Sequence, residues 1–375
     1  MDAASERVRA AAAVFRQAQS AFLPAVSASV SYSHTDLDQT GAGFTAGGFT
    51  AAGYDSYRSR SATLEFSWLL FDGLAREFNV LAARHGRDAS GHAYADAQRL
   101  LVRSVALAYY NALLAQENIL IARQDAEFNN DLVDETRKRF DAGVASRSEV
   151  LNFQIRMKQA ESRLVAEQLG FSTAKTALAE LLGVGEASFP DSLSVAEGPD
   201  PAFDKVPSFS VEYAYALSNR ADLRELRQSL MAAKATLNSE RSQFLPEVSL
   251  QGRYGEDRTY GVNTGDTESD AAVIGIAVSW DLFTGGRRYF ATREAGARVN
   301  ETLARLEQLR LSAASQLHRE IDTAGASRDQ VELQEEVYRM TAEARELVRN
   351  EYLAGKATLT RLNEAQTDLV RASGQ

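Results

Sequence analysis

The sequence predicts an α+β fold in which very long helices with coiled-coil spacing join a sheet built from four strands per chain. Three observations predict it. The same order of elements occurs twice along the chain. The segments 25–189 and 247–375 contain no proline, so long helices can run through them uninterrupted. Near the start of each copy, apolar and polar residues alternate with a period of two, which is typical of strands with one apolar face.

The internal repeat has three landmarks, and each links a residue series to its second copy. They are Phe22-Leu23-Pro24 with Phe244-Leu245-Pro246, Trp68 to Gly73 with Trp280 to Gly285, and Phe140 to Gly143 with Tyr352 to Gly355. The first pair is further apart along the chain than the other two, so the first copy has a longer, glycine-rich loop. A period of more than half the chain indicates a duplicated domain and not a solenoid. We divide the chain into a first repeat at 1–183, a linker at 184–209 and a second repeat at 210–375.

Four strands are predicted from the alternation. Their apolar faces are Val26, Ala28, Val30 and Tyr32; Leu64, Phe66, Trp68 and Leu70; Val248, Leu250 and Tyr254; and Ile274, Ile276, Val278 and Trp280. Serine, glycine, alanine or charged residues occupy most of the intervening positions. We expect the acidic residues at the far ends of these strands, such as Glu256, Asp257, Glu268 and Asp270, to lie in solvated loops.

Two very long helices are predicted at about 74–139 and 286–351, each roughly 100 Å long. In the first, apolar residues are spaced alternately four and three apart, at Leu101, Val105, Ala108, Ala112, Ala115, Ile119, Ala122 and Ala126, as in a coiled-coil seam. The polar residues Asn129 and Thr136 continue the same register. Shorter helices are predicted at 1–22, 146–182, 210–243 and 358–375, and the last one still continues where the sequence stops.

Composition excludes several classes of protein. The net charge of -10 argues against a nucleic-acid partner, and the absence of cysteine excludes thiolate chemistry. The four histidines are scattered, and we find no phosphate loop, Ser/His/Asp set or metal-ligand cluster, so we expect neither cofactor nor metal, and no enzyme. No apolar stretch approaches the ~20 residues of a membrane-spanning helix. The start lacks the features of a signal peptide, and we expect both ends to be trimmed.

Four strands cannot close a barrel, because the smallest membrane barrels need about eight. Open strand edges near Trp68 and Trp280 must therefore pair with other chains or aggregate. A ring of identical subunits removes both edges and gives a β-barrel continuous with a helical tube. The alternative is a coiled-coil structural or periplasmic adaptor protein without a pore, in which the strands form a small docking sandwich.

The sequence resembles the TolC-like outer-membrane efflux protein family. The resemblance rests on the paired joints at Pro24 and Pro246, at Trp68 to Gly73 and Trp280 to Gly285, and on the paired turns around Gly143 and Gly355. It implies an α+β membrane channel: an antiparallel coiled-coil helical barrel joined to a transmembrane β-barrel and closed by trimerisation. The implied partners are a homotrimer, outer-membrane lipid, a periplasmic adaptor and an inner-membrane transporter. The chain would then sit in the outer membrane, extend into the periplasm and have lost its export signal.

The resemblance also implies a gate at the periplasmic turns. Glu149 takes an acidic gate position, Tyr352 its tyrosine partner, and Glu364 one acidic position of the constriction. Arg361 stands where the family often has an acid, and Ala357 where it often has an arginine. The alternative is that these are ordinary surface charges near helix ends. Gly143 and Gly355 are expected to adopt the left-handed conformation that ends a helix. Trp68 and Trp280 either form an interfacial girdle or pack at the joints.

Overall fold

The computed structural model describes residues 2–38, 43–45, 48–50, 54–189, 195–196, 207–261 and 266–375. These residues form two compact units. One unit comprises residues 1–95 and 219–311, and the other comprises 96–218 and 312–375. Each unit therefore takes a part of both repeats. The boundaries at 183 and 209 stay a prediction.

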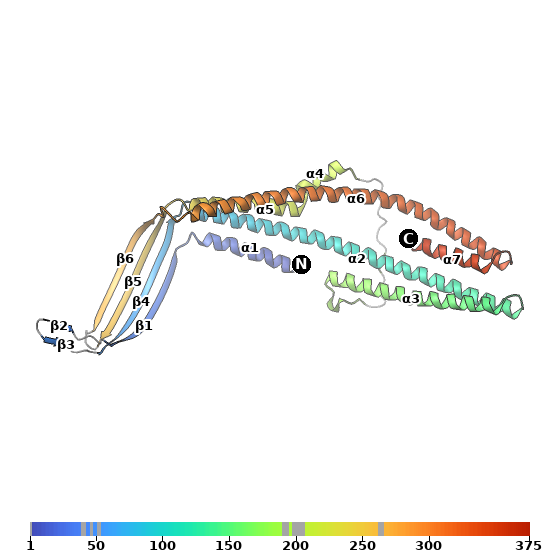
Figure 1. Cartoon of the computed structure of the whole chain (residues 1–375), viewed down its shortest axis with the longest axis horizontal. Coiled ribbons are helices and arrows are strands. Elements are labelled where there is room, and N and C mark those ends of the chain that lie inside the picture. Colours follow the sequence, from blue (N-terminus) through green and yellow to red (C-terminus); the bar gives the residue numbers. More distant parts are fainter. Residues whose placement is uncertain are drawn as a thin grey trace. The chain divides into compact units, whose positions relative to one another are not determined.

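The first unit contains a four-stranded antiparallel sheet in the order β1-β4-β5-β6 (Figure 1). Its strands are β1 (Ala25–Asp38), β4 (Tyr54–Phe71), β5 (Glu247–Gly261) and β6 (Thr267–Ser279). The two repeats meet where β4 pairs with β5. A separate short ladder joins β2 (Gly43–Thr45) to β3 (Gly48–Thr50) within the predicted loop. Gly41, Gly47 and Gly53 of that loop lie outside the described residues.

The register confirms the predicted apolar face. Val26 lies opposite Phe66, Phe66 opposite Gly252, and Gly252 opposite Ile274, so one row crosses all four strands. In the next row on the same face, Ala28, Leu64, Tyr254 and Ala272 are neighbours. Much of this face is exposed, with Val30 at 83% and Ile274 at 77%. An apolar face this exposed requires a covering partner.

The strands extend further than the sequence predicted. Asp257 pairs with Ser269 and Glu256 with Asp270, so these acidic residues lie in the ladder and not in loops. The prediction of loops was wrong because paired charges stabilise the strand ends. Arg258 forms ion pairs with Glu256 at 2.5 Å and with Glu268 at 2.6 Å, the second across the β5–β6 pair.

Both predicted long helices are confirmed as uninterrupted, in α2 (Ala75–Asp141) and α6 (Arg287–Leu353). They are followed by α3 (Arg147–Leu182) and α7 (Leu359–Ser373), and α1 (Asp2–Ser20) precedes the sheet. The coiled-coil seam of α2 is also confirmed, since Ala112 and Ala122 are almost fully buried. Thr136, on the same seam, has no exposed surface at all. None of the described helices is long and apolar enough to cross a membrane.

The prediction of a single helix at 210–243 is wrong. The chain forms α4 (Phe209–Asn219) and α5 (Ala221–Ser242), separated by Arg220 with an extended ψ of 124°. The Arg220 guanidinium binds Asp222 at 2.7 Å, and Asp222 also accepts a hydrogen bond from the backbone N–H of Leu223 at 2.8 Å. These bonds stabilise a new helix start, and the break coincides with the boundary between the two units.

The linker between the repeats begins after Gly183, which ends α3 in a left-handed conformation, and contains the one-turn helix η1 (Gly185–Ala187). Most of 184–209 lies outside the described residues, including Pro190, Pro199 and Pro201. Val195 and Ala196 of the linker lie against α2. Gln116 exchanges two hydrogen bonds with the Val195 backbone at 2.8 and 3.2 Å, and the Tyr109 hydroxyl donates to the Ala196 carbonyl.

Candidate functional site

The turns between α2 and α3 and between α6 and α7 lie together at one end of the second unit (Figure 1). We call this end the tip, residues 139–149 and 351–361. Gly143 and Gly355 have φ of 76° and 73°, which confirms the predicted left-handed conformation. The Arg139 carbonyl accepts hydrogen bonds from two N–H groups of its turn, and the Glu351 carbonyl accepts the equivalent pair. The two turns are therefore built alike.

The helices that leave the turns are capped by hydroxyl side chains. Ser146 accepts a hydrogen bond from the Glu149 N–H at 3.2 Å, and Thr358 accepts one from the Arg361 N–H at 3.3 Å. The Glu149 carboxylate in turn accepts a hydrogen bond from the Ser146 N–H at 2.9 Å, which completes a capping box. Arg361 cannot accept such a bond, and its guanidinium instead lies 3.4 Å from the Glu351 carboxylate.

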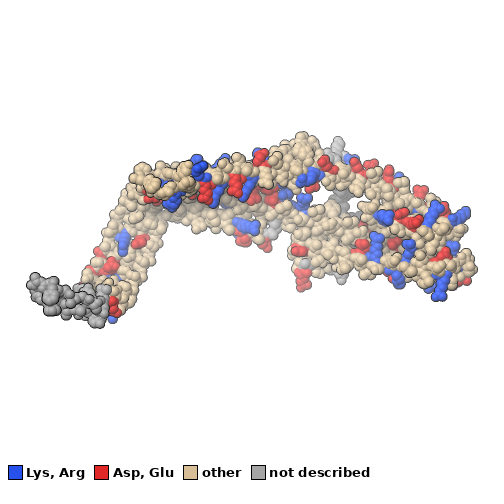
Figure 2. All heavy atoms as spheres, viewed as in Figure 1, with Lys and Arg blue, Asp and Glu red and all other residues tan. Residues whose placement is uncertain are grey.

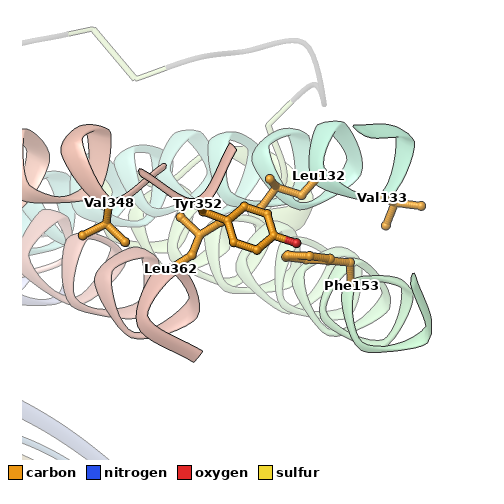
Figure 3. Close-up of a cluster of buried hydrophobic side chains, with 6 residues drawn as sticks. All are labelled: Leu132, Val133, Phe153, Val348, Tyr352 and Leu362. Atoms are coloured by element: carbon orange, nitrogen blue, oxygen red, sulfur yellow. The ribbon is translucent and has the colours of Figure 1, made fainter. Parts of the chain in front are cut away.

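Tyr352 is buried among the four helices of the tip, with only 5% of its surface exposed. It belongs to a cluster with Leu132, Val133, Phe153, Val348 and Leu362 (Figure 3). Its ring meets that of Phe153 edge to face, with centroids 6.2 Å apart. The Arg139 guanidinium lies 5.1 Å from the Tyr352 ring centroid and donates to the Tyr352 carbonyl at 3.4 Å. Tyr352 therefore holds all four helices together.

The Tyr352 hydroxyl does not bond to Glu149 in the described chain, since the bonds of the Glu149 carboxylate go to its own cap. Burial raises the pKa of the Tyr352 phenol, Thr136 lowers it, and the charge of Glu149 raises it further. The Thr136 hydroxyl lies close enough to affect the Tyr352 phenol. Its buried oxygen nevertheless makes no hydrogen bond of normal geometry to any described residue. Glu149 acts on Tyr352 through charge, and a gate role for either residue stays a prediction.

Arg361 and Glu364 lie on α7 and are both exposed. The ion pair of Arg361 is with Glu351. Glu364 instead lines a groove with Asn152, Arg156, Asp368 and Arg371. Neither Arg361 nor Glu364 belongs to the buried cluster around Tyr352.

A polar layer lies above the tip cluster, and sequence reasoning identified only part of it. The Asp125 carboxylate accepts hydrogen bonds from Gln366 at 2.8 Å and from Asn129 at 3.1 Å, which links α7 to α2. Asn129 and Asn363 are buried there. Three arginines, Arg156, Arg163 and Arg371, share a groove of about 400 Å³ with this layer. The signal in the sequence was the polar residue Asn129 within the apolar seam of α2. The residues of α7 that bond to this layer could not be predicted.

The joints between sheet and helices, in the first unit, are also built twice. Pro24 and Pro246 directly precede β1 and β5, and Gly73 and Gly285 have φ of 68° and 61° close before the long helices. The Trp68 indole donates to the Phe22 carbonyl at 2.9 Å. The Trp280 indole donates to the Phe244 carbonyl at 3.1 Å. Both tryptophans therefore bond at the joints, and a girdle role stays a prediction.

Sequence reasoning missed a buried arginine at each joint. Arg76 donates to the Leu69 carbonyl at 2.7 Å and lies 3.1 Å from the Asp72 carboxylate. Arg288, its counterpart in the second repeat, donates to the Asp281 carbonyl, the equivalent of Leu69, and lies 3.4 Å from the Asp281 carboxylate. Each guanidinium also lies over the ring of the phenylalanine two residues before the proline. The sequence did contain a signal for this pair, because Arg76 and Arg288 are separated by the repeat distance.

Two of the four histidines make side-chain contacts within their own unit. His85 hydrogen-bonds Gln228 at 2.7 Å, and the ring of His318 stacks on Phe209 with centroids 3.7 Å apart. Within the described part of the chain, no three histidine or acidic side chains are grouped so as to hold a metal ion.

Two helical hairpins that follow the strands of a four-stranded sheet are also the fold of a known outer-membrane protein. The outer membrane protein VceC of Vibrio cholerae has the same fold, with a TM-score of 0.79 and 22% identity, covering 99% of this chain and 86% of VceC. A sequence model of the family described as "Outer membrane efflux protein" matches residues 1–184 and 213–375. The chain belongs to this family.

Two curated proteins are similar to the chain in sequence. It is 27% identical over 249 residues to the alkaline protease secretion protein AprF of Pseudomonas aeruginosa, covering 66% of this chain and 51% of AprF. It is 25% identical over 316 residues to the protein CyaE of Bordetella pertussis, covering 84% of this chain and 63% of CyaE. The chain thus spans about half to two thirds of these curated relatives. The family membership favours the channel over the coiled-coil alternative and assigns the outer membrane as location.

Proposed function

We propose that the chain is one subunit of a homotrimeric outer-membrane channel, a passive duct for efflux or type I secretion that closes at its periplasmic tip. The observation that carries this proposal is the sheet. Its described strands β1 and β6 pair on one side only, and its apolar face is largely exposed. Three copies supply twelve strands, enough to close a barrel whose apolar face meets lipid.

The helices extend the duct on the periplasmic side. Three copies supply the long helices and their shorter partners as a closed tube, and the membership in the efflux family supports this assembly. A periplasmic adaptor and an inner-membrane transporter would engage the tip, since α2 and α6 lead from the strands to that end. The duct needs no catalytic group, because its cargo moves by diffusion.

The tip residues provide the closure in this proposal. Burial of Tyr352 among four helices favours the closed arrangement, and Arg139 and the Arg361–Glu351 ion pair stabilise it. Glu149 acts on Tyr352 by charge, and Glu364 contributes negative charge near the entrance. The polar layer around Asp125 favours reversibility, because separating hydrogen-bonded groups into water costs less than exposing an apolar core.

Single-channel recording in planar lipid bilayers tests the duct and its closure. We expect the purified chain to give small, rare openings, and the variant with Glu149→Ala and Tyr352→Phe to open more often with larger conductance. Adding Arg361→Ala should increase the open fraction further, whereas Lys356→Ala in the same turn is the matched control. Absence of conductance from the parent and all variants, with the protein inserted, would contradict a passive duct.

A further inference from the structure

The apolar face of the sheet becomes charged along the strands, away from the helices. From Val248 to Tyr254 on β5, each row across the sheet has apolar, aromatic or glycine residues on this face. The next row pairs Glu256 with Asp270, and the row after it contains Arg258. Figure 2 likewise shows little charge on the sheet next to the helices and charges of both signs further along it. The apolar face therefore ends at a charged border.

The charged border lies at the height where the strands of a membrane barrel leave the lipid. Val248 and Arg258 are ten residues apart on β5, or about 33 Å along a strand. Strands tilted by about 40° then rise about 25 Å, which is the height of the apolar band of outer-membrane barrels. Tyr32 lies on the row of Arg258 and Tyr260 on the next row, both exposed. Exposed tyrosines are typical of the level of the lipid headgroups.

One arginine of this border lies directly opposite another. Arg60 of β4 is paired with Arg258 of β5, and like charges in that arrangement destabilise a ladder. The charge of Arg258 is balanced by Glu256 at 2.5 Å and Glu268 at 2.6 Å. Arg60 has only an aromatic neighbour, since its guanidinium lies 5.8 Å from the ring centroid of Tyr32. The positive charge of Arg60 therefore lacks a balancing acid directly opposite it.

Arg58 lies on the same face, one row further along β4. It is paired with His34 on one side and with Tyr260 on the other, so no acid lies directly opposite it either. Asp36, an acid of the neighbouring strand, lies 3.3 Å from the His34 ring. Arg58 and Arg60 are both exposed, and their Cα atoms are about 7 Å apart by strand geometry. Two exposed guanidinium groups at this spacing suit a single anion between them.

We propose that Arg58 and Arg60 bind the phosphate monoester of a membrane lipid whose acyl chains lie on the apolar rows. The proposal rests on the proposed function, because the barrel places this face against the membrane and its far end in the outer leaflet. Guanidinium groups bind phosphate oxygens through paired N–H donors. A phosphate monoester carries nearly two negative charges at neutral pH, which match the two arginines. The bound anion also relieves the repulsion between Arg60 and Arg258.

Titration of the full chain in neutral detergent with lipid A, a glycolipid with phosphate monoesters, tests this site by native mass spectrometry. Arg60→Gln should weaken binding about fivefold, and adding Arg58→Gln should weaken it about 25-fold in total. The matched control is Arg253→Gln, which removes the same charge from an exposed position on the opposite face of β5. We expect this control to bind lipid A as the parent does.

Two further ligands identify the source of the phosphate. Dephosphorylated lipid A should bind the parent as weakly as lipid A binds the double variant. Inorganic phosphate in large excess should not displace lipid A, because it lacks acyl chains for the apolar rows. Equal binding of lipid A and its dephosphorylated form would overturn the phosphate site. Displacement by inorganic phosphate would overturn the assignment to a lipid.

Thermal unfolding separates binding from a structural role of the arginines. Lipid A should raise the unfolding temperature of the parent and of Arg253→Gln, but hardly that of the double variant. Equal shifts in all three proteins would overturn the site. Conductance measured on the same preparations keeps the two proposals apart. Normal conductance without selective lipid binding would overturn the site and leave the duct, whereas selective binding without conductance would contradict only the duct.

Discussion

The two joints and the two tip turns are both duplicated, but only the joints keep their side-chain chemistry. At each joint an indole donates to the carbonyl of the equivalent phenylalanine, and a buried arginine donates to the equivalent backbone carbonyl. At the tip, the charges are reversed between repeats. Arg139 and Glu149 of the first turn correspond to Glu351 and Arg361 at the equivalent positions of the second.

This difference indicates what each region does. A joint only has to turn the chain from strand to helix, so both copies use the same solution. The tip turns have to fit each other, and like charges at equivalent places in neighbouring hairpins would repel. Reversed charges remove that repulsion. The joints are therefore interpreted as structural and the tip as the place where the two repeats acquired different roles.

The largest expected effect on the free energy of unfolding comes from replacing the joint arginines, and it should differ between the two joints. Arg76→Met leaves the Asp72 carboxylate, whose side chain is only 5% exposed, without its ion pair and should cost about 3–5 kcal/mol in free energy of unfolding. Arg288→Met should cost about 1–3 kcal/mol, since the Asp281 carboxylate is 65% exposed and remains hydrated. Urea unfolding followed by circular dichroism measures both, and equal costs would contradict the difference.

The joint glycines should differ as well. Both have positive φ, so alanine costs about 1–2 kcal/mol at either position. A Cβ at Gly73 would also lie 2.7 Å from the Ser242 carbonyl oxygen, whereas one at Gly285 meets nothing within 4 Å. We expect Gly73→Ala to be destabilised by a further ~1–3 kcal/mol. Thermal unfolding of the two variants side by side is the comparison, and Gly285→Ala is the control.

The tip should show a pH dependence of stability in the alkaline range. Burial raises the pKa of Tyr352 above the ordinary value of 10.0. Its contribution to stability is then complete below pH 10 and is lost as pH rises through the higher, folded-state pKa. Tyr352→Phe should flatten the decline in unfolding free energy above pH 10, and Tyr338→Phe, at an exposed position on the same helix, should not. The same slope in all three proteins would mean that the phenol is not buried.

The smallest expected effect is at Leu74, which has φ of 72° where the second repeat has Gly286 with φ of 85°. Leucine is strained in this conformation and glycine is not. Leu74 is half exposed, so Leu74→Gly loses little packing and should raise the unfolding free energy by up to about 1 kcal/mol. Gly286→Leu should have the opposite sign in the same denaturant series.

Much of the fold could be predicted because its signals are local. The spacing of Ala112 and Ala122, the alternation around Val26 and the glycines of the tip each reflect one element. The break at Arg220 was missed because neither proline nor glycine marks it and the Asp222 side chain makes it. The Asp125–Gln366 bond and the burial of Tyr352 join helices from different repeats, far apart along the chain. The sequence pattern identified the tip but not which partners its side chains take.

The mass of the protein in detergent tests the central claim most directly, because every proposed role of the tip and the sheet requires three copies. The native mass, corrected for bound detergent, should equal three chains and should remain so on dilution to micromolar concentration. A stable mass of one chain, with the helical content of the folded protein, would contradict the closed barrel and the duct.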